Sequence, residues 1–337
     1  MRSSASTGSP SSPPTPRSTS SQPASLLPGR GHPEEELVSV LVVGEALIDL
    51  IVSPDGSISA IPGGGPFNTA RTIARLGTTV AFGGRLADDA FGRRLWSLLT
   101  ADGVDLALPT LPGLLTTLAL AELDPSGTAT YRFYTEGTAA PAIDAGELVL
   151  PQGTTMLSVG TLGLVLEPMA SATESLVAAL ADDVLLVVDP NCRPNVIGDV
   201  DAYRARIRRV VRRADVVKVS GDDLDYLYPN VPQASGARLL LDDGPRLVLF
   251  TDGARSVRVL ASGWEVELPV PRVEVVDTVG AGDAFGGAFI AFWQRGGYGR
   301  AELADESLVC AAVEEAIVVA GITCQRIGAD PPHLAEL

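Results

Sequence analysis

The chain has 337 residues, of which 46% are hydrophobic, and it carries a formal charge of −16. This acidic balance argues against a nucleic acid or an anionic membrane surface as a partner. A site for a polyanion would have to be built locally from main-chain amides, a few arginines and a metal ion. No apolar run approaches the roughly 20 residues that span a bilayer. Three cysteines without a CxxC pair predict a reducing compartment, and we expect the cytoplasm.

Residues 1–35 differ from the rest of the chain. They are rich in Ser, Pro and Thr and contain almost no large apolar side chains. Such a segment buries too little surface to offset its ordering entropy, so we predict a disordered tail. Its composition resembles that of an organelle transit peptide, but it lacks the continuous apolar core of a secretion signal. We expect a dispensable tail followed by one large domain over residues 36–337.

Strand and helix patterns alternate along this domain. A continuous apolar run predicts a buried strand at Val38–Val43, and apolar residues then recur at helical spacing from Ala70 to Leu76, before Gly77. The later predictions are strands at Thr79–Phe82, Met156–Val159, Val184–Asp189, Val216–Val219 and Leu247–Thr251, helices at Ala90–Leu99, Glu167–Leu180, Asp201–Arg213, Asp222–Tyr228, Ala281–Trp293 and Glu306–Thr323, and hairpins at Thr117–Tyr134 and Val257–Val270. This alternation predicts an α/β fold with a mostly parallel sheet, whose ligands bind at the carboxyl ends of the strands.

The most informative motif is Asp277-Thr278-Val279-Gly280-Ala281-Gly282-Asp283, which leads into a helix of small residues. The glycines allow the N–H groups of Gly280, Ala281 and Gly282 to point into one concavity. The positive end of the helix dipole adds to this anion site. Asp283 can take a proton from an attacking hydroxyl while the amides hold the charge on a phosphoryl group. The motif therefore predicts phosphoryl transfer, with an ordinary glycine-rich turn as the alternative.

This motif, with the small residues Gly286, Gly287 and Ala288 behind it, resembles the C-terminal signature of the ribokinase/PfkB family of carbohydrate kinases. The segment Gly63–Ala70 resembles the family's N-terminal signature, and the two stand in the family's order. The resemblance implies a ribokinase-like three-layer αβα sandwich with a small β lid from about 51–61 and 117–134, which often forms a dimer contact in relatives. It also implies an ATP-dependent sugar kinase that uses Mg²⁺, and it suggests K⁺ near Asp277.

On the sugar side, the resemblance assigns Gly64, Gly65 and Asn68 to a sugar-binding loop. It also assigns Asp49 to the acceptance of hydrogen bonds from sugar hydroxyls. Without the resemblance, the loop is a helix-entry turn and Asp49 an unremarkable acid after a strand. Arg193 is our candidate for contact with a transferred phosphate, because a guanidinium binds phosphate bidentately. A solvated arginine on a surface turn is the alternative.

On the nucleotide side, the resemblance assigns a set of residues at strand ends to ATP: Asp189, Asn191, Ser220, Thr251, Gly253 and Thr278. Ser220 and Asp223 stand where the family usually carries an Asn-x-x-Glu element linked to magnesium. Asp223 can serve a hydrated Mg²⁺ through water, or it can cap the following helix. Ser256 replaces the last glycine of the family's nucleotide loop.

The sugar itself is less clearly indicated. Pro66 and the segment Asp189–Arg193 favour a fructokinase-like substrate. A 2-keto-3-deoxygluconate kinase is the alternative, with Arg85, Arg132 or Arg193 as the contact for the substrate carboxylate. A ribose or nucleoside kinase comes third.

The sequence bears on three other classes of protein. A non-catalytic sugar- or nucleotide-binding protein on the same fold stays open because of the altered Ser220 and Ser256 positions. A P-loop kinase and a dinucleotide-binding dehydrogenase are disfavoured, because neither glycine fingerprint is present.

Overall fold

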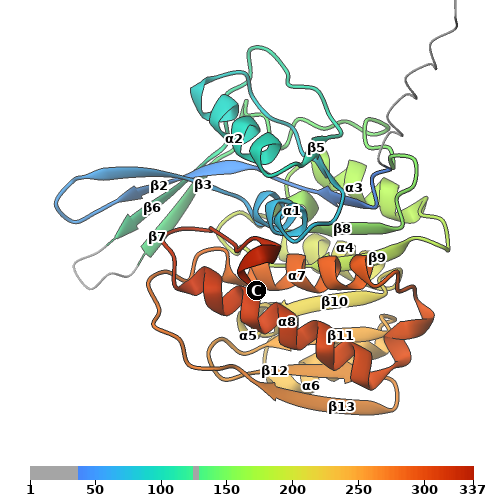
Figure 1. Ribbon diagram of the computed structural model, residues 1–337. Coiled ribbons are helices and arrows are strands. Elements are labelled where there is room, and N and C mark those ends of the chain that lie inside the picture. The colour runs from blue at the N-terminus through green and yellow to red at the C-terminus, as the bar shows by residue number, and fades with distance from the viewer. Residues whose placement is uncertain (1–36, 124–128) are drawn as a thin grey trace, which may run out of the picture. The chain divides into compact units, whose positions relative to one another are not determined.

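The computed structural model describes residues 37–123 and 129–337. The predicted tail over residues 1–35 and the tip of the first hairpin lie outside the described residues. The centre of the described part is a nine-stranded sheet whose strands follow the order β13-β12-β11-β10-β9-β8-β1-β4-β5 (Figure 1). The strands are β1 Val40–Val43, β4 Val80–Gly83, β5 Asp105–Leu106, β8 Met156–Gly160, β9 Leu185–Asp189, β10 Val216–Ser220, β11 Leu247–Thr251, β12 Ser256–Ala261 and β13 Trp264–Pro269. All are parallel except β12 and β13, which form the antiparallel edge.

Helices cover both faces of this sheet. One face packs against α1 Gly65–Arg75, α2 Ala90–Ala101, α7 Ala281–Arg295 and α8 Glu306–Cys324. The other face packs against α3 Met169–Ala178, α4 Val200–Val211, α5 Gly221–Leu227 and α6 Gln233–Asp242. Both faces are covered because both are apolar. Along β1, Val40 and Val42 point into the core on the first face, and Leu41 and Val43 point into the core on the second. The predicted α/β sandwich with a mostly parallel central sheet is confirmed.

A second, four-stranded sheet extends from the main body in Figure 1, in the order β3-β2-β6-β7. Its strands are β2 Leu47–Val52, β3 Ile58–Gly63, β6 Leu118–Leu123 and β7 Ala129–Tyr134. The first pair begins earlier than the predicted 51–61, so Asp49 lies within β2 and not after a strand as expected from the sequence. β2 pairs with β3 in an antiparallel manner and with β6 in a parallel one.

Other element boundaries also differ from the sequence prediction. α1 begins at Gly65, five residues before the predicted helix, because Gly64 turns the chain at a φ of 108° and Pro66 occupies the first turn. α6 and β5 were not predicted at all. Three short 3₁₀ turns complete the described elements: η1 Thr161–Leu164, η2 Ala301–Ala304 and η3 Leu334–Glu336.

α8 is a long apolar helix. By length and composition alone it could cross a membrane, with a mean hydropathy of 1.8 over an 18-residue window. In the fold it packs along α7, and Val309, Val313 and Ala316 are buried in the core. Packing of this kind accounts for an apolar helix in a protein interior.

Candidate active site

The polar residues of interest collect at one edge of the large sheet. β8 and β9 end together at Gly160 and Asp189, and β10 and β11 end together at Ser220 and Thr251. Gly160 must be a glycine, since a Cβ there would lie 1.9 Å from the carbonyl oxygen of Asp189. The predicted ligand edge of the parallel strands thus brings together the strand-end residues that the sequence singled out.

The first turn of α7 presents free main-chain amides at this edge. Gly280 caps the helix in the left-handed conformation, with a φ of 76°. The N–H of Ala281 donates to the carbonyl of Thr278 at 3.3 Å, whereas those of Gly280 and Gly282 donate to no group within the described residues. Asp277 braces the turn by accepting from the N–H groups of Val279 and Gly328. Two of the three predicted amides are therefore available to an anion.

The structure places Gly65 and Asn68 of the predicted sugar loop in the first turn of α1, and Asp283 faces this turn. Its Oδ2 accepts a 2.9 Å hydrogen bond from Nδ2 of Asn68, which is 215 residues away in the chain. Asp283 remains half-buried, so it is accessible from solvent. A Cβ at Gly65 would lie 3.1 Å from Oδ1 of Asp283 and 3.4 Å from Nδ2 of Asn191. The absence of a side chain at Gly65 lets the loop approach this carboxylate closely.

Asp49 and Arg193 lie beside this carboxylate. Burial raises the pKa of Asp49 to about 6, and the negative charge of Asp283 adds to the increase. The positive charge of Arg193 acts in the opposite direction on the pKa of Asp49. Arg193 is exposed and makes a long hydrogen bond to the neighbouring carbonyl of Cys192. The charges of Asp49, Arg193 and the proposed base Asp283 are thus coupled.

Lys218 is a site residue that the sequence analysis did not assign. It is the only lysine in the chain, and its Nζ donates to Oδ2 of Asp189 at 2.8 Å. A Cβ at Gly282 would lie 3.0 Å from this ammonium, so the charge lies against the amide turn of α7. Burial opposes the charged form of Lys218, but Asp189 and Asp223 outweigh it and raise the pKa. A lone lysine inside an apolar strand was the available signal.

Asp189 and Asp223 complete the charges around Lys218. Burial raises the pKa of Asp189 to about 6 despite the lysine. Its Oδ1 is buried and has no hydrogen-bond partner within the described residues. Asp223 caps α5 by a reciprocal pair of bonds with Ser220 and also accepts from the N–H of Cys192. Of the two alternatives for Asp223, the cap is observed, and a magnesium role stays a prediction.

The remaining nucleotide candidates lie along the same edge. Ser220 and Thr251 are register partners on neighbouring strands, and Thr251 donates its hydroxyl to the carbonyl of Val219. Gly253 is exposed in the turn after β11, with a φ of 54°. Thr278 is exposed just before the amide turn. These positions outline a path from β11 to α7.

The three arginines considered for a substrate carboxylate differ in their freedom to serve it. Arg85 is buried, and its guanidinium donates to the carbonyls of Ala142 and Pro109 and to Glu147. Arg132 lies on β7, is two-thirds exposed, and pairs with Glu122 at 3.5 Å. Arg85 is therefore committed to these contacts, whereas Arg132 and Arg193 remain candidates.

Glu45 is the second residue that the sequence analysis missed. It stands two residues after the end of β1 and is 1% exposed. Its Oε1 accepts from the N–H of Gly65 at 3.2 Å and its Oε2 from the N–H of Leu162 at 3.1 Å. The signal was an acid two residues after a buried strand, at the edge where parallel strands bind ligands.

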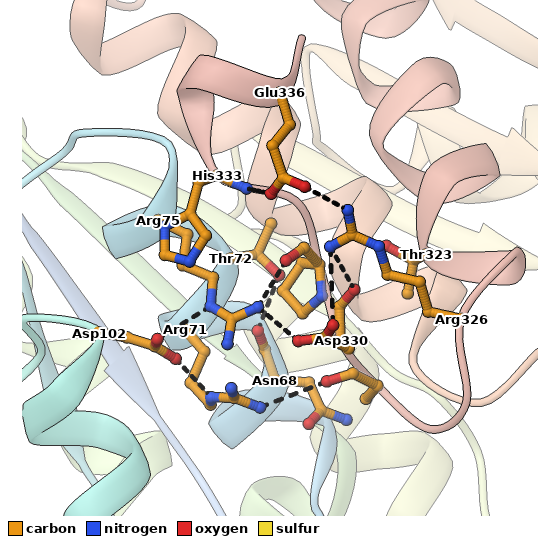
Figure 2. A network of polar contacts seen from close by, with 12 residues as sticks. Asn68, Arg71, Thr72, Arg75, Asp102, Thr323, Arg326, Asp330, His333 and Glu336 are labelled. Atoms are coloured by element: carbon orange, nitrogen blue, oxygen red, sulfur yellow. Dashed lines mark hydrogen bonds and ion pairs between the residues drawn. The ribbon is translucent and has the colours of Figure 1, made fainter.

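A buried ionic network holds α1 in place from behind (Figure 2). Arg71 and Arg75 both donate to Asp102, at 2.6 and 2.9 Å. Arg75 also reaches Asp330, in the segment after α8. The neighbouring Ala329 packs on Gly280, since a Cβ at Gly280 would lie 2.3 Å from that of Ala329. The network therefore connects the helix that carries Asn68 with the support of the amide turn.

The fold and site indicate a class: an α/β phosphotransferase, in which a helix-terminal amide turn and the carboxylate of Asp283 face the glycine-rich start of α1. The model of the pfkB family carbohydrate kinases matches residues 38–335, so the chain belongs to this family and is a sugar kinase. The fructokinase of Rhizobium leguminosarum bv. trifolii is 35% identical over 257 residues, which cover 75% of this chain and 78% of the relative.

Solved structures agree with this assignment. The ATP-bound fructokinase from Xylella fastidiosa matches with a TM-score of 0.80 and 27% identity, covering 88% of this chain and 96% of that one. A fructokinase double mutant from Vibrio cholerae O395, bound to fructose, ADP and a potassium ion, matches with a TM-score of 0.78 and 28% identity over 87% and 94% of the two chains. The family predicted from the two signatures is confirmed.

Proposed function

We propose that this sugar kinase is an ATP-dependent fructokinase, which transfers the γ-phosphate of ATP to a hydroxyl of fructose. The observation that carries the mechanism is the half-buried carboxylate of Asp283, held by Asn68 beside the free N–H groups of Gly280 and Gly282. The fructokinase names of the relatives and structural neighbours support the choice of sugar.

The sugar lies between Asp49, the loop Gly64–Asn68 and the four-stranded sheet. Asp283 takes the proton of the acceptor hydroxyl as its oxygen attacks the γ-phosphorus, and ADP leaves with the bridging oxygen. The N–H groups of Gly280 and Gly282 hold the charge on the transferred phosphoryl group. The four-stranded sheet acts as a lid that keeps water from competing with the sugar.

ATP extends over the strand ends named above, and positive charge is scarce there. Arg193 serves the transferred phosphate from the open side, because its guanidinium is exposed and near Asp49. Lys218 supplies a fixed charge on the other side of the amide turn. In a chain of charge −16, these two groups carry the local attraction for a polyanion.

The site suits a magnesium ion that is bound mainly by the phosphates of ATP, with few protein ligands. No group of three potential ligands among His, Cys, Asp and Glu occurs in the described residues. The unpartnered Oδ1 of Asp189 and, through water, Asp223 are the residues that would contact it. When bound, Mg²⁺ neutralises phosphate charge. Each carboxylate oxygen of Asp277 accepts from one N–H group, which leaves lone pairs that would contact K⁺.

Two wider features belong to the same proposal. We assign the enzyme to the cytoplasm, in keeping with three free cysteines. A homodimer through the four-stranded sheet is supported by the exposed side chains of Ile58 and Tyr134, which the strand register places on one face.

A substrate panel tests the function. Purified protein is given ATP–Mg²⁺ with fructose, 2-keto-3-deoxygluconate, ribose or adenosine, and ADP release is followed. We expect the kcat/KM for fructose to exceed the others by at least about tenfold, the scale of a well-built sugar site. Faster turnover of 2-keto-3-deoxygluconate would reassign the substrate, and no turnover of any acceptor would favour a binding protein. Asp283→Asn, prepared in parallel, controls for contaminating kinases.

A further inference from the structure

Glu45 joins three segments that meet beneath the sugar loop. Its own main chain packs against Gly64, where a Cβ would lie 2.6 Å from the Glu45 carbonyl oxygen. Its side chain then bridges the N–H of Gly65, at the start of α1, and the N–H of Leu162, in η1. Gly65 in turn lies against Asp283, as a Cβ there would come within 3.1 Å of the carboxylate. One buried side chain thus sets the position of the loop relative to the proposed base.

The surroundings of this carboxyl group contain no directly paired cation among the described residues. Burial raises the pKa of Glu45 to about 8, and the charge of Asp283 on α7 adds to the increase. The bonds from main-chain N–H groups and the more distant Arg193, after β9, act in the opposite direction. The charges of Asp283 and Arg193 also act on Asp49 in β2, where burial raises the pKa only to about 6.

We propose that Glu45 is a positioning residue of the kinase reaction, whose ionised carboxylate pins Gly65 to Leu162 and so fixes the sugar loop against Asp283. The inference rests on the proposed function for its kinetic readout. It extends that function by naming a second ionisable group, one that touches neither substrate and acts through the loop.

Burial favours the protonated form of Glu45 up to about pH 8, whereas the hydrogen-bond geometry fits the ionised form. Two N–H donors point at the two oxygens, and a carboxylate accepts both. Protonation turns one oxygen into a hydroxyl, which weakens that bond and adds a donor without an acceptor. We therefore expect the loop to tighten as pH rises through about 8, the value to which burial raises the pKa of this group.

Glu45→Gln tests this directly, because the amide has the shape of the protonated acid and cannot ionise. The kcat/KM for fructose is measured from about pH 6 to 9.5, beside wild type and the control Glu315→Gln, which removes the half-buried partner of Arg295 between α7 and α8. Wild type and control should gain activity through about pH 8. Glu45→Gln should lack this rise and be ~5- to 10-fold slower at high pH, the value of one hydrogen bond, yet close to wild type at low pH. The KM for ATP should change less than about twofold, since Glu45 contacts only the sugar side.

An activity-independent measurement separates this inference from the choice of substrate. Infrared difference spectra of the ligand-free protein across the same pH range should show the C=O stretch of a protonated carboxylic acid that disappears near pH 8 and is absent in Glu45→Gln. Persistence of that band in the variant, or an unchanged alkaline rise in kcat/KM, contradicts the proposal. If the enzyme prefers another sugar, the spectra and the profile with that sugar still decide on Glu45.

Discussion

At the scale of single residues, backbone strain gathers at the site. Three non-glycine residues of the described chain have a positive φ, and two of them, Thr161 at 53° and Asn191 at 39°, flank Gly65. Such conformations cost about 1–3 kcal/mol each and persist where the surrounding structure enforces them. Close packing at the strand ends holds these two residues in place. The hydroxyl of Thr161 and the side-chain amide of Asn191 both approach the position that a Cβ of Gly65 would occupy.

Asp49→Asn should separate stability from sugar binding. Because burial and Asp283 raise the folded-state pKa of Asp49 from 3.8 to about 6, the ionised form costs stability. The stability that the protonated group contributes is complete below about pH 4 and is lost as pH rises through about 6. The variant should therefore be more stable than wild type at pH 7.5, by at most about 3 kcal/mol. Denaturant melts at both ends of this pH range provide the measurement.

The same variant should bind fructose poorly, because a carboxylate is a stronger acceptor for sugar hydroxyls than an amide. We expect the KM for fructose to rise by roughly tenfold or more, with little change in the KM for ATP. A variant that is less stable at pH 7.5, or that keeps its sugar affinity, contradicts the assignment of Asp49 as a sugar ligand whose pKa is raised in the fold.

How far the sequence predicts the site depends on how local each signal is. Asp283, Gly282 and Asn68 lie in continuous motifs whose glycines have a direct conformational meaning, and they meet as expected. Glu45 and Lys218 stand alone in the sequence. Their importance depends on which strands become neighbours in the sheet and on which glycines come close to these side chains. A single residue in the sequence predicts neither of these contacts.

At the scale of elements, α1 carries Asn68 to the proposed base Asp283, and the position of this helix depends on buried charges. Arg71, Arg75 and Asp102 have side chains that are 10% exposed or less. Removing one partner of such a group leaves uncompensated charge in a poorly solvated place, which costs far more than loss of a surface pair. The network in Figure 2 also reaches the segment after α8 that supports Gly280.

Asp102→Asn should accordingly destabilise the protein by roughly 3 kcal/mol, measured by urea unfolding. The matched control is Glu265→Gln, which removes the partner of the 65%-exposed Arg238 and should cost under about 1 kcal/mol. Equal, small effects in both variants would show that the α1 network contributes no more than a surface pair.

The boundaries of elements with a strong apolar periodicity were predictable from the sequence. The prediction was wrong where backbone geometry determines the boundary. The start of α1 was placed too late, because the helix begins with Gly65 and Pro66 and not with its apolar stripe. α6 was missed since its apolar face is short, with Gly236 and Ala237 in contact with the rest of the molecule in place of larger side chains. Both errors arise from small residues that pack closely.

At the scale of the whole molecule, the fold works by bringing distant chain segments to one sheet edge. The glycines Gly64 and Gly65 begin α1, the capping pair Ser220 and Asp223 stands where β10 meets α5, and the amide turn begins α7. Although these segments are far apart in the sequence, Asn68 and Asp283 are hydrogen-bonded. Strand–helix alternation predicted this convergence in outline, since ligands bind at the carboxyl ends of parallel strands. It could not predict the pairing of β2 with β6, which builds a second sheet from segments about 70 residues apart.

The central claim is that the carboxylate of Asp283 acts as the base in phosphoryl transfer beside the amide turn. Its most direct test is the single-turnover rate of Asp283→Asn with saturating ATP–Mg²⁺ and fructose, with ATP affinity measured separately by calorimetry. We expect the rate to fall by about 10²- to 10⁴-fold, the range for a general base, while the Kd for ATP stays within about threefold. A variant that turns over at nearly the wild-type rate would contradict this claim.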